Sequence, residues 1–234
     1  MNDSDDILAV PLWINGHAFL TMAPAFFDVR DARSGRVRRR TPLCGASQAA
    51  TAVDAAAAAL PAWTSLAVGE RAALLATLAD VLAGYGSHFA GLIAEESGQE
   101  DAVAAAEVET ALRLLRGAAA AVPATRGDCV VAIVCDHLAP LAGLLERAVP
   151  ALLAGSTVVA KPSPRAPSAA VALAELTARS GFPAGAFNVL HGDVEAIEGL
   201  CADPALGRLL FAGEPALANR VAEIAGRHGR QLTS

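Results

Sequence analysis

Apolar runs alternate with amphipathic stretches along the second half of the chain. The run Cys129–Cys135 is continuously apolar, which is typical of a strand buried on both faces of a parallel sheet. Further strands are predicted at Ser156–Lys161, Ala186–His191 and Arg208–Ala212, and helices at Leu141–Ala154, Pro167–Ser180, Glu195–Cys201 and Pro215–His228. Strands that alternate with helices at this spacing form βαβ units, so the pattern predicts a parallel sheet with flanking helices.

The first forty residues show a different pattern, with short strands and tight turns. Trp13–Phe19 surrounds Asn15-Gly16, which is a strong hairpin signal. A second hairpin is predicted from Phe26–Arg30 to Arg36–Thr41, with Ser34 and Gly35 at its turn. The basic run in the last of these strands contains no interleaved aromatic residue. We interpret it as a solvated edge that blocks strand pairing.

Helical periodicity covers the stretch from Ser47 to Val122. Ser47 and Ser87 are the predicted helix N-caps, because a serine hydroxyl can accept a hydrogen bond from a free amide of the first turn. A long helix is predicted over Glu100–Ala121, and Pro123 is expected to end it.

These elements predict an α/β fold with a Rossmann-like parallel sheet, preceded by N-terminal hairpins and helices. We expect a single domain over residues 1–234, with N-terminal strands and a helical layer in 1–122 and the βαβ part in 123–234. The N-terminal helices are expected to pack on the sheet, because no low-complexity linker separates the two parts.

Composition and charge narrow the class of protein. Hydrophobic residues make up 54% of the chain, much of it alanine, but no apolar stretch of ~18 residues predicts a membrane span. The net charge of −6 gives no overall attraction to nucleic acid or to an anionic membrane. The acidic start lacks the features of a signal peptide, so a cytoplasmic, bacterial protein is the default expectation.

The four cysteines, Cys44, Cys129, Cys135 and Cys201, have no CxxC or zinc-type spacing. We expect reduced thiols and no metal site. Cys135 and His137 lie two residues apart and could in principle pair as nucleophile and base. Because Cys135 ends an apolar strand and His137 follows it in a loop, we favour a structural role for both.

Three segments carry a resemblance to a known family. Ile14 to Gly16, Pro150 to Ala170 and Phe182 to Asp193 occur in the order seen in the aldehyde dehydrogenase superfamily, and the chain resembles its N-terminal, NAD(P)-binding half. The resemblance implies a Rossmann-type fold. In ordinary members it also implies NAD(P)-dependent aldehyde oxidation through a cysteine thiohemiacetal.

The resemblance also implies that the catalytic groups are missing. The family's cysteine nucleophile and glutamate base would lie beyond Ser234, and its oxyanion asparagine aligns with Leu138. Leucine cannot donate a hydrogen bond, and the loss of one oxyanion donor lowers the rate by roughly 10²–10³. We therefore expect no catalytic residue in this chain and no enzymatic activity from it alone.

The family's phosphate-binding glycine motif is altered here. Of G-S-x-x-x-G only Gly213 remains, since Glu214 and Ala218 replace the serine and the last glycine. A Glu214 carboxylate that capped the helix would repel phosphate by on the order of 4 kcal/mol at ~4 Å. Of a second glycine motif, Gly192 and Gly199 remain, but Val194 stands where another glycine is expected. This degenerate site predicts that NAD(P) is not a bound cofactor, or binds only weakly.

Some cofactor features remain, and we take Lys161, Ser163, Gly192 and Gly213 as vestigial cofactor-binding residues. The resemblance implies that Lys161, in the segment KPSP, reaches the adenosine ribose. The alternative, that it bonds local carbonyls at a strand end, stays open. Arg165 is a candidate for holding a 2′-phosphate.

The family's long oligomerisation hairpin is also expected to be missing, because the stretch from Leu115 to Cys129 is too short for it. The face left by the absent catalytic domain predicts a protein partner or self-association. We therefore expect a non-catalytic aldehyde dehydrogenase-like pseudoenzyme that serves as a scaffold or partner subunit. The alternatives are the NAD(P)-binding half of a split aldehyde oxidoreductase and a small nucleotide-binding module.

Overall fold

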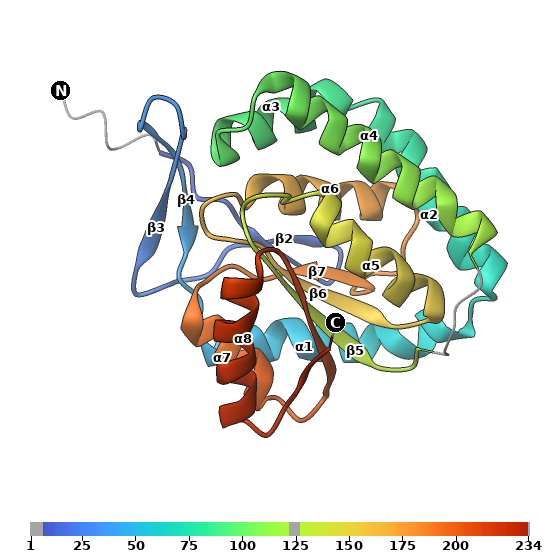
Figure 1. Ribbon diagram of the computed structural model, residues 1–234. Helices are drawn as coiled ribbons and strands as arrows, with labels where there is room; N and C mark the ends of the chain where they lie inside the picture. The colour runs from blue at the N-terminus through green and yellow to red at the C-terminus, as the bar shows by residue number, and fades with distance from the viewer. Residues whose placement is uncertain (1–6, 122–126, 234) are drawn as a thin grey trace.

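A seven-stranded sheet forms the centre of the molecule, with the strand order β2-β1-β7-β6-β5-β8-β9 (Figure 1). The computed structural model describes residues 7–121 and 127–233. Strands β5 to β9 run parallel to one another, whereas β1 runs antiparallel to both of its neighbours, β2 and β7. The strands of this sheet are β1 (Leu12–Ile14), β2 (His17–Phe19), β5 (Val130–Cys135), β6 (Thr157–Lys161), β7 (Phe187–Val189), β8 (Leu206–Ala212) and β9 (Leu232–Thr233). The predicted α/β fold with a Rossmann-like parallel sheet is confirmed.

Helices cover both faces of the sheet (Figure 1). Three of them lie on one face: α1 (Ala46–Ser65), α7 (Val194–Ala202) and α8 (Pro215–Arg227). The helices of the other side are α2 (Val68–Ala83), α3 (Gly86–Ser97), α4 (Asp101–Gly117), α5 (Ala142–Ala154) and α6 (Ser168–Arg179). Of the N-terminal helices, α1 packs on the sheet as the sequence predicted, whereas α2, α3 and α4 form an outer layer on α5 and α6 (Figure 1).

The apolar run of β5 follows from its position at the middle of this sandwich. All six of its residues are buried. Val131 and Ile133 belong to the core on the side of α5, while Ala132 and Val134 belong to the core on the side of α1. A strand that is covered on both faces has no solvent side, so its sequence shows no polar alternation.

The first hairpin has the predicted turn. Asn15 and Gly16 both adopt positive φ angles, 54° and 79°, as a two-residue turn of this kind requires. The backbone amide of Asn15 donates to Asn188 Oδ1 at 3.0 Å, and the Asn188 side-chain amide donates to the Gly185 carbonyl at 2.7 Å. The buried Asn188 on β7 thus fixes the hairpin against the parallel sheet.

The second hairpin forms a separate two-stranded sheet of β3 (Phe26–Arg30) and β4 (Val37–Pro42). Its basic residues do more than face solvent. Arg38 and Arg39 form ion pairs with Glu95 on α3, and Arg40 pairs with Asp28 across the hairpin. The interpretation as a solvated edge was incomplete, because it could not include the acidic end of a helix distant in sequence.

The predicted helix starts were wrong at both serines. Helix α1 has Gly45 as its N-cap, and the Gly45 amide donates to the Gln48 side chain at 3.2 Å. Helix α3 begins after Tyr85, so Ser47 and Ser87 lie inside their first turns. Helix α4 ends at Gly117 and is followed by a 3-10 turn over Ala118–Ala120; Pro123 lies outside the described residues.

The segment in which the family's long hairpin would lie forms no strand among its described residues, which are 118–121 and 127–129. No helix in the described part of the chain is both long and apolar enough to cross a bilayer. The cytoplasmic location stays a prediction.

Candidate functional site

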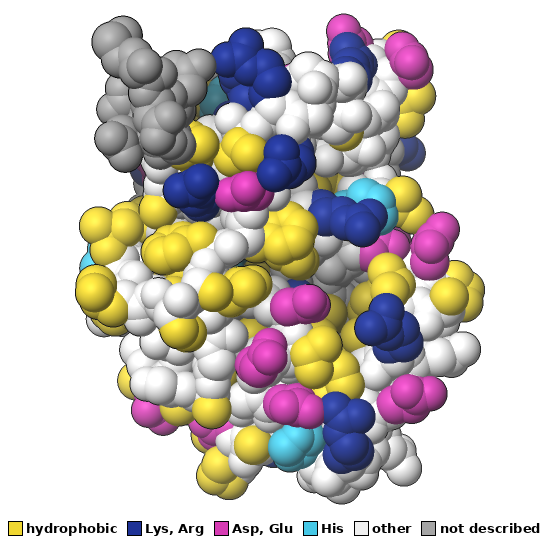
Figure 2. All heavy atoms as spheres, turned by 90° about the vertical axis from the view of Figure 1, so that its left-hand side faces the viewer, with side chains coloured by type: hydrophobic (Ala, Val, Ile, Leu, Met, Phe, Trp, Pro, Cys, Tyr) yellow, Lys and Arg dark blue, Asp and Glu magenta, His cyan; other side chains and the backbone are white. Residues whose placement is uncertain are grey.

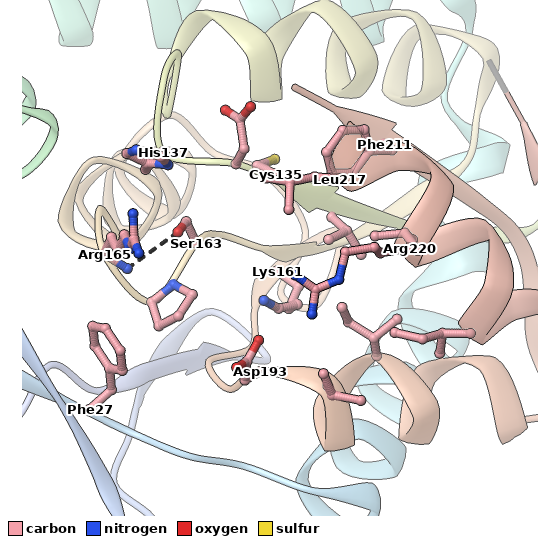
Figure 3. A pocket seen from close by; sticks show the side chains of 17 residues that line it. Phe27, Cys135, His137, Lys161, Ser163, Arg165, Asp193, Phe211, Leu217 and Arg220 are labelled. Carbon is pink, nitrogen blue, oxygen red and sulfur yellow. Dashed lines mark hydrogen bonds between the residues drawn. The ribbon is translucent and has the colours of Figure 1, made fainter. Parts of the chain in front are cut away.

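A cleft of about 350 Å³ opens at the carboxyl ends of β5, β6 and β8, between helices α7 and α8 (Figure 3). Ligands of open parallel sheets bind at this edge, because the loops that follow the strands converge there. One wall is apolar, and it is lined by Val194, Ile197, Phe211, Leu217, Val221 and Ile224. The opposite side carries charged and polar groups from the strand ends.

Lys161, the last residue of β6, lies in the cleft with only 3% of its surface exposed. Burial lowers the pKa of its ammonium to about 8, and the neighbouring Asp193 carboxylate partly opposes this shift. Among the described residues, no group accepts a hydrogen bond from Lys161 within the distances that define one. The Lys161 ammonium therefore faces the open cleft beside the Asp193 carboxylate, where it can bind an anionic group of a ligand.

Ser163 and Arg165 follow in the loop between β6 and α6, and both line the cleft. The Ser163 hydroxyl accepts a hydrogen bond from the Arg165 backbone amide at 3.3 Å, and the Arg165 side chain is exposed. Ser163 and Lys161 are therefore brought together, as the sequence predicted.

The loop is held in place by Glu96 of α3. Its carboxylate accepts hydrogen bonds from the Ser168 amide at 3.0 Å and from the Ser168 hydroxyl at 2.5 Å, at the first residue of α6. It also forms an ion pair with Arg39 at 3.2 Å. Burial raises the pKa of Glu96 to about 7, although Ser168 and Arg39 partly offset that effect.

Asp136, directly after β5, occupies the space at the start of α8. Its two carboxylate oxygens accept hydrogen bonds from the Leu138 and Glu214 backbone amides, each at 2.8 Å. Gly213 has a φ of +148°, and a Cβ there would lie 2.2 Å from the Asp136 carboxylate. Gly213 therefore allows this close approach and does not itself line the cleft.

The Glu214 side chain is not where the charge argument placed it. It is exposed, makes no capping hydrogen bond and does not line the cleft. The N-cap backbone is extended, and Asp136 accepts the Glu214 amide, so the glutamate side chain is free to point into solvent. Repulsion of phosphate by a Glu214 carboxylate buried in the site is therefore not part of this structure.

Gly192 also lies outside the cleft lining. Its φ is +128°, and a Cβ there would lie 2.7 Å from the Ala196 side chain and 2.8 Å from the Cys44 carbonyl. Its role here is to let the loop after β7 pack against α7 and the segment before α1. Of the four residues predicted for the cofactor, Lys161 and Ser163 meet in the cleft, and the two glycines shape its surroundings.

Sequence reasoning missed Arg220 and Asp193, which both line the cleft. In Figure 3 the Arg220 side chain reaches from α8 into the cleft towards Lys161, and Asp193 lies on the other side of Lys161. A signal existed for Arg220, because Leu217 and Ile224 are three and four residues away and share its helix face. Only the fold shows that this face borders a cleft.

The amide groups at the start of α5 are also satisfied internally. Glu107 of α4 is 9% exposed, and its Oε1 accepts hydrogen bonds from the Leu141 and Ala142 amides at 2.9 and 3.1 Å. Leu138 exposes 44% of its surface, and its side chain has no hydrogen-bond donor.

None of the cysteines in the cleft region is an activated thiol. Cys135 lines the cleft, but burial raises the pKa of its thiol to about 12 despite the nearby Lys161. Burial also raises the pKa of Cys44 to about 11. A nucleophilic cysteine needs the opposite shift, so burial disfavours Cys135 as the nucleophile of a pair with His137.

Comparison with known proteins places this chain in a family. The model of the aldehyde dehydrogenase family matches residues 20–234. The succinate-semialdehyde dehydrogenase [NADP(+)] of Escherichia coli is 31% identical over 95% of this chain and 50% of its own length. The malonate-semialdehyde dehydrogenase of Pseudomonas aeruginosa is 29% identical over 88% of this chain and 45% of its own. The chain thus spans about half the length of the curated relatives it matches.

Solved structures agree with this match. Lactaldehyde dehydrogenase from Escherichia coli superimposes with a TM-score of 0.88 at 24% identity, covering 97% of this chain and 51% of its own. A mutant of aldehyde dehydrogenase C from Pseudomonas syringae, in complex with NAD⁺ and octanal, gives a TM-score of 0.88 at 25% identity and covers 95% of this chain and 49% of its own.

These findings correct one expectation from the sequence. The expectation that NAD(P) is not a cofactor of this chain is wrong, because the matched half of the family is the NAD-binding half and some of the similar structures, such as that of aldehyde dehydrogenase C, are complexes with NAD⁺. The physical error was to place the Glu214 carboxylate among the phosphate-binding amides, from which it points away. With residues 20–234 matched by the family model, this chain belongs to the aldehyde dehydrogenase family and carries its NAD-binding half.

Proposed function

We propose that this chain binds NAD(P) in the cleft at the carboxyl edge of the sheet and acts as the cofactor-holding subunit of an aldehyde dehydrogenase-type assembly. The observation that carries the proposal is Lys161, a residue only 3% exposed whose ammonium lies in the cleft and has no hydrogen-bond acceptor among the described residues. An anionic nucleotide would supply that acceptor.

The shape of the cleft supports the same ligand. The apolar wall between α7 and α8 suits a flat adenine ring, and the charged groups at the strand ends suit ribose hydroxyls and phosphates. The names of similar proteins include both NADP(+), for the Escherichia coli relative, and NAD⁺, for the Pseudomonas syringae structure. Bound NAD(P)⁺ supplies hydride acceptance, and the residues of this cleft bind and orient it.

We further propose that the chain does not oxidise aldehydes with its own described residues. The cleft thiol Cys135 is held protonated by burial, and Leu138 offers no oxyanion donor. This chain would then serve as a scaffold or cofactor-holding subunit for another polypeptide. A split aldehyde oxidoreductase, in which that polypeptide supplies the nucleophile and base, is the second candidate.

An apolar surface is available for such a partner. Leu20, Met22 and Phe26 expose 76%, 96% and 46% of their surfaces. Figure 2 views the molecule from the side of β3 and β4, where hydrophobic side chains gather among interspersed basic and acidic groups. Exposed apolar patches of this kind favour contact with another protein.

The test is a calorimetric titration of the purified chain with NAD⁺ and NADP⁺. A Lys161→Met variant should bind at least about tenfold more weakly, since a charge-assisted contact contributes roughly 1.5–3 kcal/mol. The matched control is Arg113→Met, an exposed cation on α4 away from the cleft, which should bind like the wild type. Absence of binding at millimolar cofactor would refute the proposal.

The second half of the proposal is tested by adding an aldehyde to the chain with NAD⁺ or NADP⁺. We expect no absorbance of reduced nicotinamide from the chain alone. Appearance of that absorbance would show that the described residues suffice for oxidation and would contradict the partner role.

A further inference from the structure

Arg220 is an unusual residue for its position. It lies on α8 between Leu217 and Ile224, on the helix face that forms the apolar wall of the cleft. Its guanidinium points into the cleft towards Lys161 (Figure 3). No acidic side chain in the described part of the chain forms an ion pair with it. The cleft thus contains a cation that the protein itself leaves unneutralised.

The shape of the cleft determines which part of a dinucleotide meets this cation. The surface suited to an adenine ring is the apolar slot between α7 and α8, formed by Ile197, Leu217 and Val221. The ribose of an adenine nucleotide bound in that slot would lie beside it, at the carboxyl ends of the strands. On that side the Arg220 side chain points towards Lys161 (Figure 3).

The side chains that line the cleft carry more positive than negative charge, and uncharged ribose hydroxyls would not neutralise this excess. Lys161, Arg165 and Arg220 are cationic, whereas the acids of the cleft are Asp136 and Asp193. Both oxygens of Asp136 already accept backbone amides, so its charge is satisfied inside the protein. Asp193 is exposed and faces Lys161. Arg220 remains as a positive charge beside an otherwise neutral sugar.

We propose that Arg220 makes this cleft select NADP over NAD by binding the 2′-phosphate of the adenosine ribose. The inference rests on the proposed function, since it concerns the same nucleotide in the same cleft. A phosphate monoester carries about −1.5 to −2 charges near neutral pH, and a planar guanidinium can contact two of its oxygens. Lys161 supplies the second cation from the opposite side.

Arg165 offers a matched comparison within the same cleft. It is also exposed and cationic, but it lies beside Ser163, away from the point where Lys161 and Arg220 meet (Figure 3). Removing its charge weakens the attraction for both dinucleotides alike. Removing Arg220 affects the nucleotide that carries the extra phosphate.

The experiment measures dissociation constants of the full chain for NADP⁺ and NAD⁺ in the wild type, Arg220→Gln and Arg165→Gln. Both side chains are exposed, so folding is not expected to change. We expect the wild type to prefer NADP⁺ by about ten- to hundredfold, from one charge-assisted contact. Arg220→Gln should remove most of that preference and leave NAD⁺ binding within about threefold. Arg165→Gln should retain the preference.

Adenosine 2′-monophosphate and adenosine 3′-monophosphate serve as positional probes. The 2′ isomer should bind more tightly, and only its binding should depend on Arg220. Equal binding of NAD⁺ and NADP⁺, a preference that follows Arg165, or tighter binding of the 3′ isomer would each overturn the inference while leaving nucleotide binding intact. Failure of both dinucleotides to bind would instead refute the proposed function.

Discussion

Replacing Glu96 with glutamine should change how the stability of this protein depends on pH. The Glu96 side chain is 2% exposed and holds the start of α6 through the Ser168 amide and hydroxyl. Glutamine has nearly the same shape and can still accept from Ser168, but it carries no charge at any pH. The substitution therefore removes an ionisation and keeps most of the packing.

The magnitude follows from the pKa of Glu96, which burial raises from an ordinary 4.5 to about 7. Because the pKa of Glu96 is higher in the folded than in the unfolded protein, the contribution of Glu96 to the free energy of unfolding is fully present below pH 4.5. This contribution is lost as the pH rises through about 7. At 1.36 kcal/mol per pH unit, this difference corresponds to about 3 kcal/mol.

His191 changes the free energy of unfolding in the opposite direction to Glu96, over an overlapping range of pH. Its Nε2 donates to the Pro11 carbonyl at 3.0 Å, and its Nδ1 is buried without a partner. Burial lowers the pKa of His191 from 6.5 to about 4, so its contribution is present above pH 6.5 and is lost as the pH falls through about 4. Between pH 4.5 and 6.5 the two groups nearly cancel in the wild type.

The assay is urea unfolding followed by the fluorescence of the buried Trp63, at pH values from 4.5 to 8. When the pH falls from 7 to 4.5, Glu96 adds about 3 kcal/mol to the free energy of unfolding of the wild type, and Glu96→Gln lacks this contribution. The free energy of unfolding of the variant should therefore fall by about 3 kcal/mol relative to the wild type over this range, or about 6–12 °C in Tm. His191→Gln should show the reverse, with stability falling as the pH rises. The control is Glu95→Gln, a more exposed acid that shares Arg39. A Glu96→Gln profile parallel to that of the wild type would refute the reasoning.

Two further substitutions test contacts that hold the fold around the site. Arg71→Met should lower the free energy of unfolding by about 3 kcal/mol, because the buried Arg71 guanidinium donates hydrogen bonds to the Leu153 and Leu66 carbonyls at 2.9 and 2.5 Å. Thermal unfolding of this variant is compared with that of the control Arg113→Met. Equal stability of the two variants would contradict the prediction. Gly213→Ala should destabilise by about 1–3 kcal/mol more than Gly229→Ala, because both glycines have positive φ but only at Gly213 would the new Cβ meet the Asp136 carboxylate. Urea unfolding of the two variants compares them, and similar losses would show that the close contact is relieved without cost.

The sequence predicted most of the fold because its signals are local. The apolar run of β5, the Asn15-Gly16 turn and the alternation of strands and helices each depend on neighbours in the chain, and each appears in the structure within a residue or two. The helix starts at Ser47 and Ser87 were wrong because several adjacent residues could serve as caps. The choice between them depends on where the chain turns against its tertiary neighbours.

The candidate site was predicted only in part, for a related reason. Lys161 and Ser163 were found because they lie in one short motif, and the structure brings them together in the cleft. Arg220 and Asp193 come from two other segments, and no local pattern connects them to Lys161. Glu214 was assigned a role from its position in a motif, although its side chain points into solvent.

The sequence by itself determined the family and the α/β architecture, since hydrophobic periodicity, turn chemistry and motif order are properties of consecutive residues. The tertiary structure decided the charge of the site. It placed Arg220 opposite Lys161, let Asp136 take the amides at the start of α8, and turned Glu214 away. Electrostatic energy depends on distance and burial, and these are set only when segments remote in the sequence pack around one cleft.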